Sequence, residues 1–412
     1  MILAHGLGGR SDLPVPLWLA LYAGAAAVVV SFFALTILWK EPKLRGADAG
    51  RELPLSLQRF VDSAFTRIAL RVLGVALFAG FLAVAVAGPD SSADNPAPAW
   101  FYAWFWVGLV PLSLLFGPVW RRLNPLRTVA SLIPARHREL PDRLGYLPAI
   151  LGLLAFLWLE LVFPYSDSPH AIALFCAVYA VIHIAFGVVF GPRWFDRGDA
   201  FEVYARLIAA LSPFGRRGDG RLVVRNPLDG LLTISPAPWL TALVLVVLGS
   251  TAFDGLTRLP FWTSLDAGVL GGTVLVGTAG LAACIALTYG AYAGAISLTR
   301  PYLRRGFDPY PAFAPSLIPI MVGYTVAHYF SFAVFSGQQG FGRAIDYTVV
   351  STGVIALVQI AGIVAGHVLA VTSAHDRSVG VLRANYVKVG QYPMLALMIG
   401  YTALGIALVS GS

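Results

Sequence analysis

The residues most able to do chemistry in this sequence are three histidines that lie inside long apolar stretches. Two of them belong to one pattern, Tyr-x-x-x-His, which occurs at Tyr179 and His183 and again at Tyr324 and His328. Residues four apart lie on one face of an α-helix, and polar groups inside a membrane almost always face the interior of the bundle. We therefore predict two polar stripes, on two helices, that face the interior of the protein. Cys176 extends the first stripe, Ser331 extends the second, and the third histidine is His367.

The histidine stripes could hold a metal ion, because neutral imidazole is a common metal ligand as well as a proton carrier. Two histidines from different helices could bind a divalent metal ion that activates water, and we predict His183 and His328 as these ligands. Ligation of a haem iron is a second interpretation, and simple interhelical hydrogen bonds are a third. The expected depths disfavour a site with all three histidines, because His328 should lie in the outer half of its helix and His367 near the inner end of its own.

Glu160 is the only acidic residue well inside an apolar stretch, near the outer end of its predicted helix. An intramembrane carboxylate is a functional candidate by default, so we assign Glu160 as a general base or metal ligand and His367 as a second catalytic candidate. The alternative for Glu160 is a carboxylate at the membrane surface that reaches water or pairs with His170. The neighbours His375 and Asp376 are expected to form a solvated helix end, because adjacent residues on a helix do not face each other.

The elements that must position these residues follow from a composition that requires a largely lipid environment. Of the 412 residues, 58% are hydrophobic and 12% are charged, whereas soluble domains carry roughly 25% charged residues. The mean hydropathy is +0.74. The two cysteines, Cys176 and Cys284, form no disulfide framework and no metal-binding spacing. No Walker A, HExxH or GxSxG motif occurs in the sequence.

The apolar stretches predict an all-α fold, a polytopic transmembrane helical bundle of about ten spans. A helix needs about 20 apolar residues to cross the hydrocarbon core. Helices satisfy their backbone groups internally, as lipid requires, and a β-barrel would instead show short alternating segments. We expect residues 1–412 to form one integral membrane domain without a cleavable signal peptide, since the first apolar run is too long for one. The predicted spans are 15–39, 68–90, 99–120, 145–164, 170–192, 236–254, 268–297, 313–336, 346–371 and 390–410.

The distribution of basic residues predicts the orientation of these spans. With the N-terminus and the C-terminus outside, 26 of the 29 Lys and Arg residues fall in inner loops, and only Arg10, Arg258 and Arg343 lie outside. Such an asymmetry is typical of a multi-pass protein, here of the plasma (inner) membrane. The net charge of +8 is then explained by topology and by anionic lipid. The lipid bilayer is therefore the expected partner, and nucleic acid is excluded.

The longest inner loop, 193–235, is predicted to carry an interfacial helix. Its residues Phe201, Tyr204, Leu207 and Ile208 share one apolar face. A short amphipathic helix of this kind can lie in the plane of the membrane surface with that face turned toward the lipid.

A short phrase occurs twice and marks the inner ends of two predicted spans. It reads Phe-Gly-Pro-Val-Trp at 116–120 and Phe-Gly-Pro-Arg-Trp at 190–194. Gly-Pro ends a helix, and Trp anchors at the lipid headgroups. We expect two similar helix ends at the inner membrane surface, and a duplicated two-helix unit is the alternative interpretation.

Five phrases of the sequence are familiar as a set. They are His5–Pro16, reading HGLGGRSDLPVP; Phe116–Pro125, reading FGPVWRRLNP; Gly249–Gly255, reading GSTAFDG; Phe313–Pro319, reading FAPSLIP, with the following His328; and Gly366–His367 with Ala374–Arg377. Together they resemble the bacterial integral membrane proteins, common in actinobacteria, that bear the name fenitrothion hydrolase. The resemblance extends over nearly the whole chain.

The resemblance implies a membrane-bound hydrolase that cleaves an organophosphorus triester, or a similar hydrophobic ester, at the bond to its aryl leaving group. Such a hydrophobic small-molecule substrate would reach the site from the bilayer. The chemistry needs an activated water and stabilisation of charge on the phosphoryl oxygen, which a histidine-bound metal would supply. The family contributes no catalytic motif, so Glu160, His183, His328 and His367 remain candidates on their own chemistry. The alternative function is a transporter, or a membrane subunit of a larger or redox complex, with a second membrane subunit as its partner.

Overall fold

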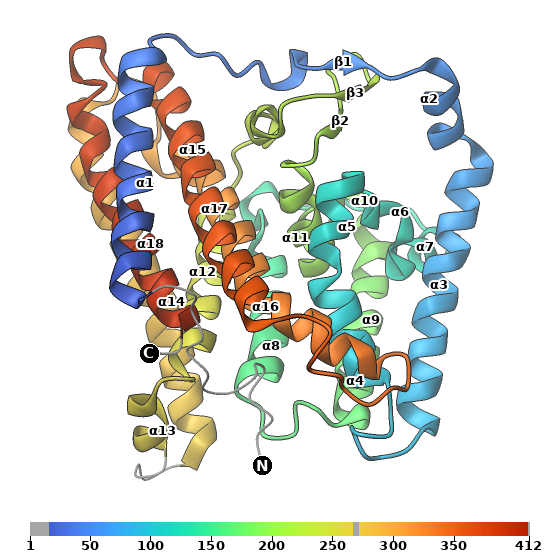
Figure 1. Ribbon diagram of the computed structural model, residues 1–412. Coiled ribbons are helices and arrows are strands. Elements are labelled where there is room, and N and C mark those ends of the chain that lie inside the picture. Colours follow the sequence, from blue (N-terminus) through green and yellow to red (C-terminus); the bar gives the residue numbers. More distant parts are fainter. Residues whose placement is uncertain (1–15, 267–271, 411–412) are drawn as a thin grey trace.

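The computed structural model describes residues 16–266 and 272–410, and it is almost entirely helical (Figure 1). Nine helical segments of this described chain are long and apolar enough to cross a membrane. The predicted all-α polytopic helical bundle is therefore confirmed. The glycine-rich phrase that begins at His5 lies outside the described residues, except for Pro16 at its end.

The sixth of the ten predicted spans, 236–254, corresponds to a helical segment that is shorter than these nine. This helix, α12 (Leu240–Leu256), has 17 residues, of which 13 are buried. It is buried because it lies in the middle of the bundle (Figure 1). The longer segments comprise α1 (Leu17–Leu38), α3 (Ala64–Ala87), α4 (Ala97–Ala99) with the π-helix η2 (Trp100–Val107) and α5 (Leu109–Phe116), α8 (Leu147–Leu161), α9 (Pro169–Phe190), α14 (Gly272–Thr299), α15 (Pro309–Phe313) with η6 (Ala314–Leu317) and α16 (Ile318–Gln339), α17 (Thr352–Val381) and α18 (Tyr392–Ser410).

Shorter elements connect the spans. A small antiparallel sheet has the strand order β1-β3-β2 and lies at one end of the bundle (Figure 1). The strands are β1 (Arg51–Glu52), β2 (Phe214–Arg216) and β3 (Leu222–Val224). The short helices are α2 (Leu55–Asp62), α6 (Trp120–Leu123), α7 (Pro125–Leu132), α10 (Pro192–Arg197), α11 (Ala200–Ala209) and α13 (Pro260–Asp266), and the remaining helical turns are η1 (Gly46–Asp48), η3 (Asp142–Leu144), η4 (Pro227–Thr233), η5 (Arg300–Tyr302), η7 (Ala384–Tyr386) and η8 (Val389–Gln391).

The segments predicted as inner loops contact one another at the end of the bundle that carries the sheet. β1 follows α1 in the chain, and it pairs with β3 from the loop that follows α11. Arg216 of this loop and Arg122 both bind the Asp62 carboxylate. These two arginines hold the pKa of Asp62 below its ordinary value. The distribution of Lys and Arg predicts that these loops lie on one side of the membrane, and here they lie together at one end of the bundle. This end of the bundle is called the inner end below, and the opposite end is called the outer end.

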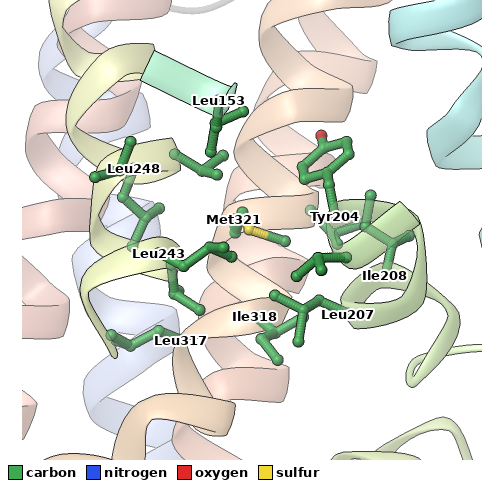
Figure 2. Packing of buried hydrophobic residues seen from close by; sticks show 14 of the residues in the cluster. Leu153, Tyr204, Leu207, Ile208, Leu243, Leu248, Leu317, Ile318 and Met321 are labelled. Carbon is green, nitrogen blue, oxygen red and sulfur yellow. The ribbon is translucent and has the colours of Figure 1, made fainter. Parts of the chain in front are cut away.

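The helix α11 is present where an interfacial helix was predicted, but it does not lie on the surface. Nine of its ten residues are buried. Figure 2 shows Tyr204, Leu207 and Ile208 packed among residues of α12 and α16, including Leu243 and Met321. The interfacial interpretation was wrong because an apolar face packs equally well against lipid or against neighbouring helices. A helix that does not span the membrane is tolerated at this depth where protein surrounds it.

The helices α16 and α17 pack so closely that their backbones touch. A Cβ atom added at Gly323 would lie 2.3 Å from the backbone oxygen of Gly362, and one added at Gly366 would lie 2.7 Å from the oxygen of Pro319. Small residues permit this approach in membrane bundles. This closely packed pair carries His328 on α16 and His367 on α17.

Candidate functional site: a buried ionisable cluster

The most concentrated group of ionisable residues in the outer half joins α12 and α16. His328 Nε2 lies 2.6 Å from Asp254 Oδ2 and 3.0 Å from a guanidinium nitrogen of Arg258. Asp254, near the outer end of α12, and Arg258, which follows that helix, are themselves 3.6 Å apart. His328 and Asp254 are buried, whereas the Arg258 side chain is 22% exposed.

A single nitrogen of His328 therefore faces both an acceptor and a donor. When Nε2 carries a proton it can donate to the Asp254 carboxylate, and when it carries none it can accept from Arg258. The other nitrogen, Nδ1, is buried and has no hydrogen-bond partner among the described residues. Nε2 can thus be either protonated, with Asp254 as its partner, or unprotonated, with Arg258 as its partner, while α12 and α16 stay in place.

Glu160 lies at the outer end of α8 and is 4% exposed. Both of its carboxylate oxygens are buried, and neither makes a hydrogen bond of ordinary geometry within the described chain. Its electrostatic neighbours are the Tyr329 hydroxyl and the Asp254 carboxylate. The alternative of a surface carboxylate paired with His170 is wrong, because His170 instead lies 3.5 Å from Asp90 in the outer loops.

Tyrosines enclose these groups. The ring of Tyr324 stacks on His328 with centroids 5.7 Å apart, and the ring of Tyr329 meets the same imidazole edge-on at 4.9 Å. The Tyr324 hydroxyl is buried and has no hydrogen-bond partner in the described chain. The predicted stripe on α16 does face the interior, and Ser331 is buried one turn beyond His328. We call Glu160, Asp254, Arg258, Tyr324, His328 and Tyr329 the outer cluster.

His183 belongs to a different part of the bundle, nearer the inner end. Its Nδ1 accepts a hydrogen bond of 3.0 Å from the Trp194 indole, and its ring is tilted against that of Tyr179 with centroids 4.0 Å apart. Tyr179 in turn donates to Asp199 Oδ1 at 2.8 Å. Both residues of this stripe are buried as predicted, but Trp194 is buried too and is not a headgroup anchor.

The structure does not bring His183 and His328 together, because each has its own separate set of partners. Within residues 16–266 and 272–410, it shows no group of three or more His, Cys, Asp or Glu side chains that could hold a metal ion. Helical spacing correctly predicted the face on which each histidine lies. It could not predict which helix would be its neighbour.

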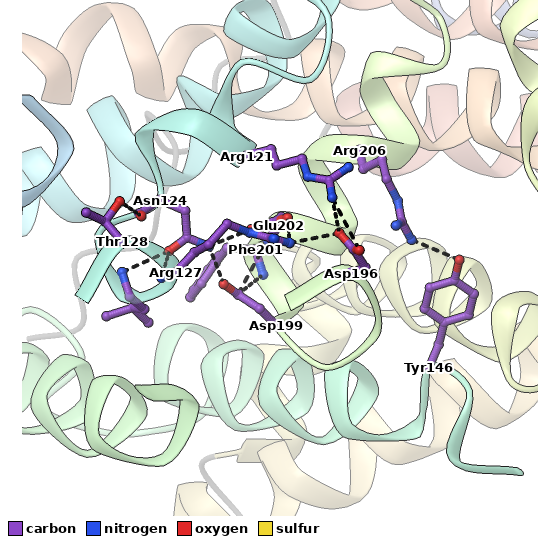
Figure 3. A network of polar contacts seen from close by, with 11 residues as sticks. Arg121, Asn124, Arg127, Thr128, Tyr146, Asp196, Asp199, Phe201, Glu202 and Arg206 are labelled. Carbon is purple, nitrogen blue, oxygen red and sulfur yellow. Dashed lines mark hydrogen bonds and ion pairs between the residues drawn. The ribbon is translucent and has the colours of Figure 1, made fainter. Parts of the chain in front are cut away.

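A set of polar residues around Asp199 forms a network at the inner end (Figure 3). The Asn124 side chain donates to Asp199 Oδ2 at 2.7 Å and to Glu202 Oε2 at 2.8 Å. Arg127 binds Glu202 at 2.9 Å and Asp196 at 2.8 Å. We call these five residues the inner network, and their bonds allow the charged first turn of α11 to be buried.

The segments that follow the two copies of the Phe-Gly-Pro-x-Trp phrase supply both sides of this network. Gly117 and Gly191 adopt the same left-handed conformation, with φ of 70° and 68°, at the ends of α5 and α9. A capping residue follows each phrase: Asn124 begins α7, and Asp199 begins α11. The repeat was visible in the sequence, but the contact between the segments that follow its two copies was not.

His367 and His375 lie on α17, away from the outer cluster's hydrogen bonds. His367 Nδ1 donates to the Ile363 carbonyl at 2.9 Å, and its buried Nε2 has no partner in the described chain.

His375 contacts Gln391 Oε1 at 3.0 Å and the Trp39 carbonyl at 2.9 Å. His375 and Asp376 are both buried, so the expected solvated helix end is wrong. Asp376 instead binds the backbone N–H groups of Lys43 and Leu44 and the Trp39 indole, which fastens the chain after α1 to α17.

Sequence reasoning missed Asp254, Arg258 and Tyr329 as members of the site. The available signal was the four-residue spacing of Asp254 and Arg258, which puts opposite charges on one face at a helix end. Arg258 had been counted only as one of the few outer basic residues. Its contact with His328 depends on the packing of α12 against α16, which no local pattern contains.

The fold and the outer cluster define a class: a polytopic α-helical membrane protein with an ionisable centre enclosed in its bundle. No protein-family model, no curated protein and no solved structure matches the chain.

Replacing Arg127 with Met should strongly destabilise the protein. Glu202 is 3% exposed and would lose its charged partner, and breaking a buried ion pair costs about 3–5 kcal/mol. The matched control is Arg121→Met, because Arg121 is 51% exposed where it pairs with Asp196, and such surface pairs contribute about 0–1 kcal/mol. The free energies of unfolding in detergent would be compared. Equal losses in the two variants would contradict a structural role for the inner network.

Proposed function

We propose that the protein is a proton-coupled membrane transporter whose proton-binding centre is the outer cluster. One observation carries the proposal: Glu160 is buried, and neither carboxylate oxygen makes a hydrogen bond of ordinary geometry or pairs with a cation in the described chain. Chains of Asp, Glu and His inside membrane bundles are characteristic of proton relays in pumps and transporters.

The physical argument starts from the cost of a charge at this position. An ionised carboxylate away from water is strongly disfavoured unless it is paired and hydrogen-bonded. Glu160 is buried and has no cation paired with it among the described residues, so its neutral, protonated form is favoured. It can lose its proton when the surrounding helices rearrange and supply a partner or water. That coupling of protonation to helix position is what a proton-driven transporter requires.

His328 and Arg258 supply the connection to the outside. Arg258 is the partly exposed member of the outer cluster, and it contacts the nitrogen of His328 that also faces Asp254. A proton that arrives at His328 changes the partner of this nitrogen from Arg258 to Asp254. Because Asp254 interacts electrostatically with Glu160, the arrival of the proton at His328 changes the electrostatic potential at the Glu160 carboxyl group.

The substitution Glu160→Gln should abolish proton entry into the outer half of the bundle, because an amide cannot bind and release the proton. Proteoliposomes on a solid-supported membrane would be exposed to a jump in external pH, and the displaced charge recorded. We expect a loss of about tenfold or more, since the group lies inside the membrane field. Glu139→Gln is the control, because Glu139 is exposed on an inner loop. Unchanged currents in Glu160→Gln would contradict the proposal.

We propose as a second candidate a hydrolase of the fenitrothion type, with His328 as its general base. The observation that favours it is the 2.6 Å contact of His328 with Asp254, which could orient the imidazole while Nδ1 stays without a partner. Nδ1 would take a proton from water as the water oxygen attacks phosphorus. The P–O bond to the aryl group then breaks, and the proton passes to the departing aryloxide.

The hydrolase candidate predicts that purified protein releases 4-nitrophenol from a 4-nitrophenyl phosphotriester. His328→Ala should lower the rate by about 10²–10⁴-fold, the usual contribution of a general base. Glu139→Gln should leave the rate unchanged, because that side chain is exposed on the opposite side of the protein from the outer cluster. If the His328→Ala variant releases 4-nitrophenol as fast as the unchanged protein, the hydrolase candidate is wrong.

A further inference from the structure

A large cavity lies between α3 and the helices η2, α5, α7 and α9. Its volume is about 590 Å³, within the range of small-molecule binding sites. In Figure 1, α3 stands at the edge of the bundle. At its inner side it is held against α6, where a Cβ added at Gly74 would overlap the backbone oxygen of Leu123. The cavity is lined by the aromatic residues Phe78, Phe81, Trp100, Phe101, Trp104, Phe105, Trp120, Phe175, Tyr179 and Phe201.

The cavity has a polar end formed by Asn124, Tyr179 and Asp199, and Asp199 is the only charged residue that lines it. Asp199 is 2% exposed. Its oxygens accept hydrogen bonds from Asn124, from Tyr179 and from the backbone N–H groups of Phe201 and Glu202. All of these donors are neutral.

The charge of Asp199 is therefore not balanced by a cation. Its neighbours Asp196 and Glu202 both pair with Arg127. In the described chain, no Lys, Arg or His side chain forms an ion pair with Asp199. A buried carboxylate that lacks a positive partner favours a ligand that brings one.

We propose that this aromatic cavity binds a lipophilic organic cation drawn from the membrane. Aromatic faces attract cations through their quadrupoles, and Asp199 adds a full negative charge at one end. A phospholipid would bring a phosphate toward a carboxylate, and a neutral hydrophobe would leave Asp199 unbalanced. Charge complementarity thus selects the cation over the lipid and over the neutral compound.

The cavity is close to the outer cluster, which suggests how bound cations could be moved. Phe101 lines the cavity and packs on Phe156, with centroids 5.7 Å apart, one turn before Glu160 on α8. Tyr102, the neighbour of Phe101, interacts electrostatically with Glu160. The cavity and the carboxyl group are thus separated by one aromatic layer. The claim that the protein transports this cation rests on the proposed function. The claim that the cavity binds the cation does not, because binding can be measured by itself.

The test uses two probes of the same shape and opposite charge. Purified full-length protein in nanodiscs would be titrated with tetraphenylphosphonium and with tetraphenylborate, and binding followed by tryptophan fluorescence. We expect saturable binding of tetraphenylphosphonium, weakened about tenfold by Asp199→Asn, which removes the charge but keeps a good helix cap. Tetraphenylborate should bind at least about tenfold more weakly than the cation, because its charge opposes that of Asp199.

A second variant keeps the inference falsifiable if Asp199→Asn does not fold. Gly80 lies on α3 and lines the cavity, and a Cβ there meets nothing within 4 Å. Gly80→Leu should therefore fill the cavity and abolish cation binding. Gly290→Leu is its control, because Gly290 is also exposed on a spanning helix with open space around it, outside the cavity.

Each outcome decides one of the two proposals. Equal binding of both ions, or cation binding that survives both Asp199→Asn and Gly80→Leu, overturns the cation site. Lipid tails or a partner helix that co-purify in the cavity and exclude the cation overturn it as well. Glu160→Gln should still bind tetraphenylphosphonium. If it does so while its pH-jump currents are unchanged, the proton function fails and the cation site stands.

Discussion

Isolating a carboxyl group from water inside a membrane bundle is the constraint on which the rest of this structure depends. Six carboxyl side chains are buried in the described interior, and five of them accept hydrogen bonds of ordinary geometry, including Asp229 and Asp376. Asp199 accepts bonds from neutral donors, Glu202 pairs with Arg127, and Asp254 contacts His328 and Arg258. Glu160 alone has neither a hydrogen bond of ordinary geometry nor a paired cation there. An exception of this kind is more readily explained by function than by stability.

The helix α11 shows how the same constraint shapes the fold. Its charged first turn can enter the bundle only because Arg127 on α7, and Asn124 at the start of α7, reach it. Once inside, its apolar residues fill the centre between α12 and α16 (Figure 2). One short helix therefore links the inner network, the aromatic cavity and the outer cluster, because Phe201 lines the cavity while Tyr204 interacts with Glu160.

Much of the fold could be predicted from the sequence, because long apolar runs and the bias of Lys and Arg depend on the membrane alone. The inward orientation of the stripes at His183 and His328 followed from helical spacing. Their assembly into one metal site did not follow, because periodicity determines a face and not a neighbour. The amphipathic pattern of α11 likewise does not distinguish lipid from protein, and the contact of Arg258 with His328 joins residues 70 positions apart.

The protonation state of Glu160 tests the central claim most directly. Infrared difference spectra of the reconstituted protein, recorded across a pH titration, report the carbonyl stretch of protonated carboxyl groups. The account predicts a band of a buried protonated carboxyl at neutral pH, because burial without a partner disfavours the charged form. The band should disappear as pH rises, and it should be missing from Glu160→Gln but present in Glu139→Gln. A band that persists unchanged in Glu160→Gln would contradict the account.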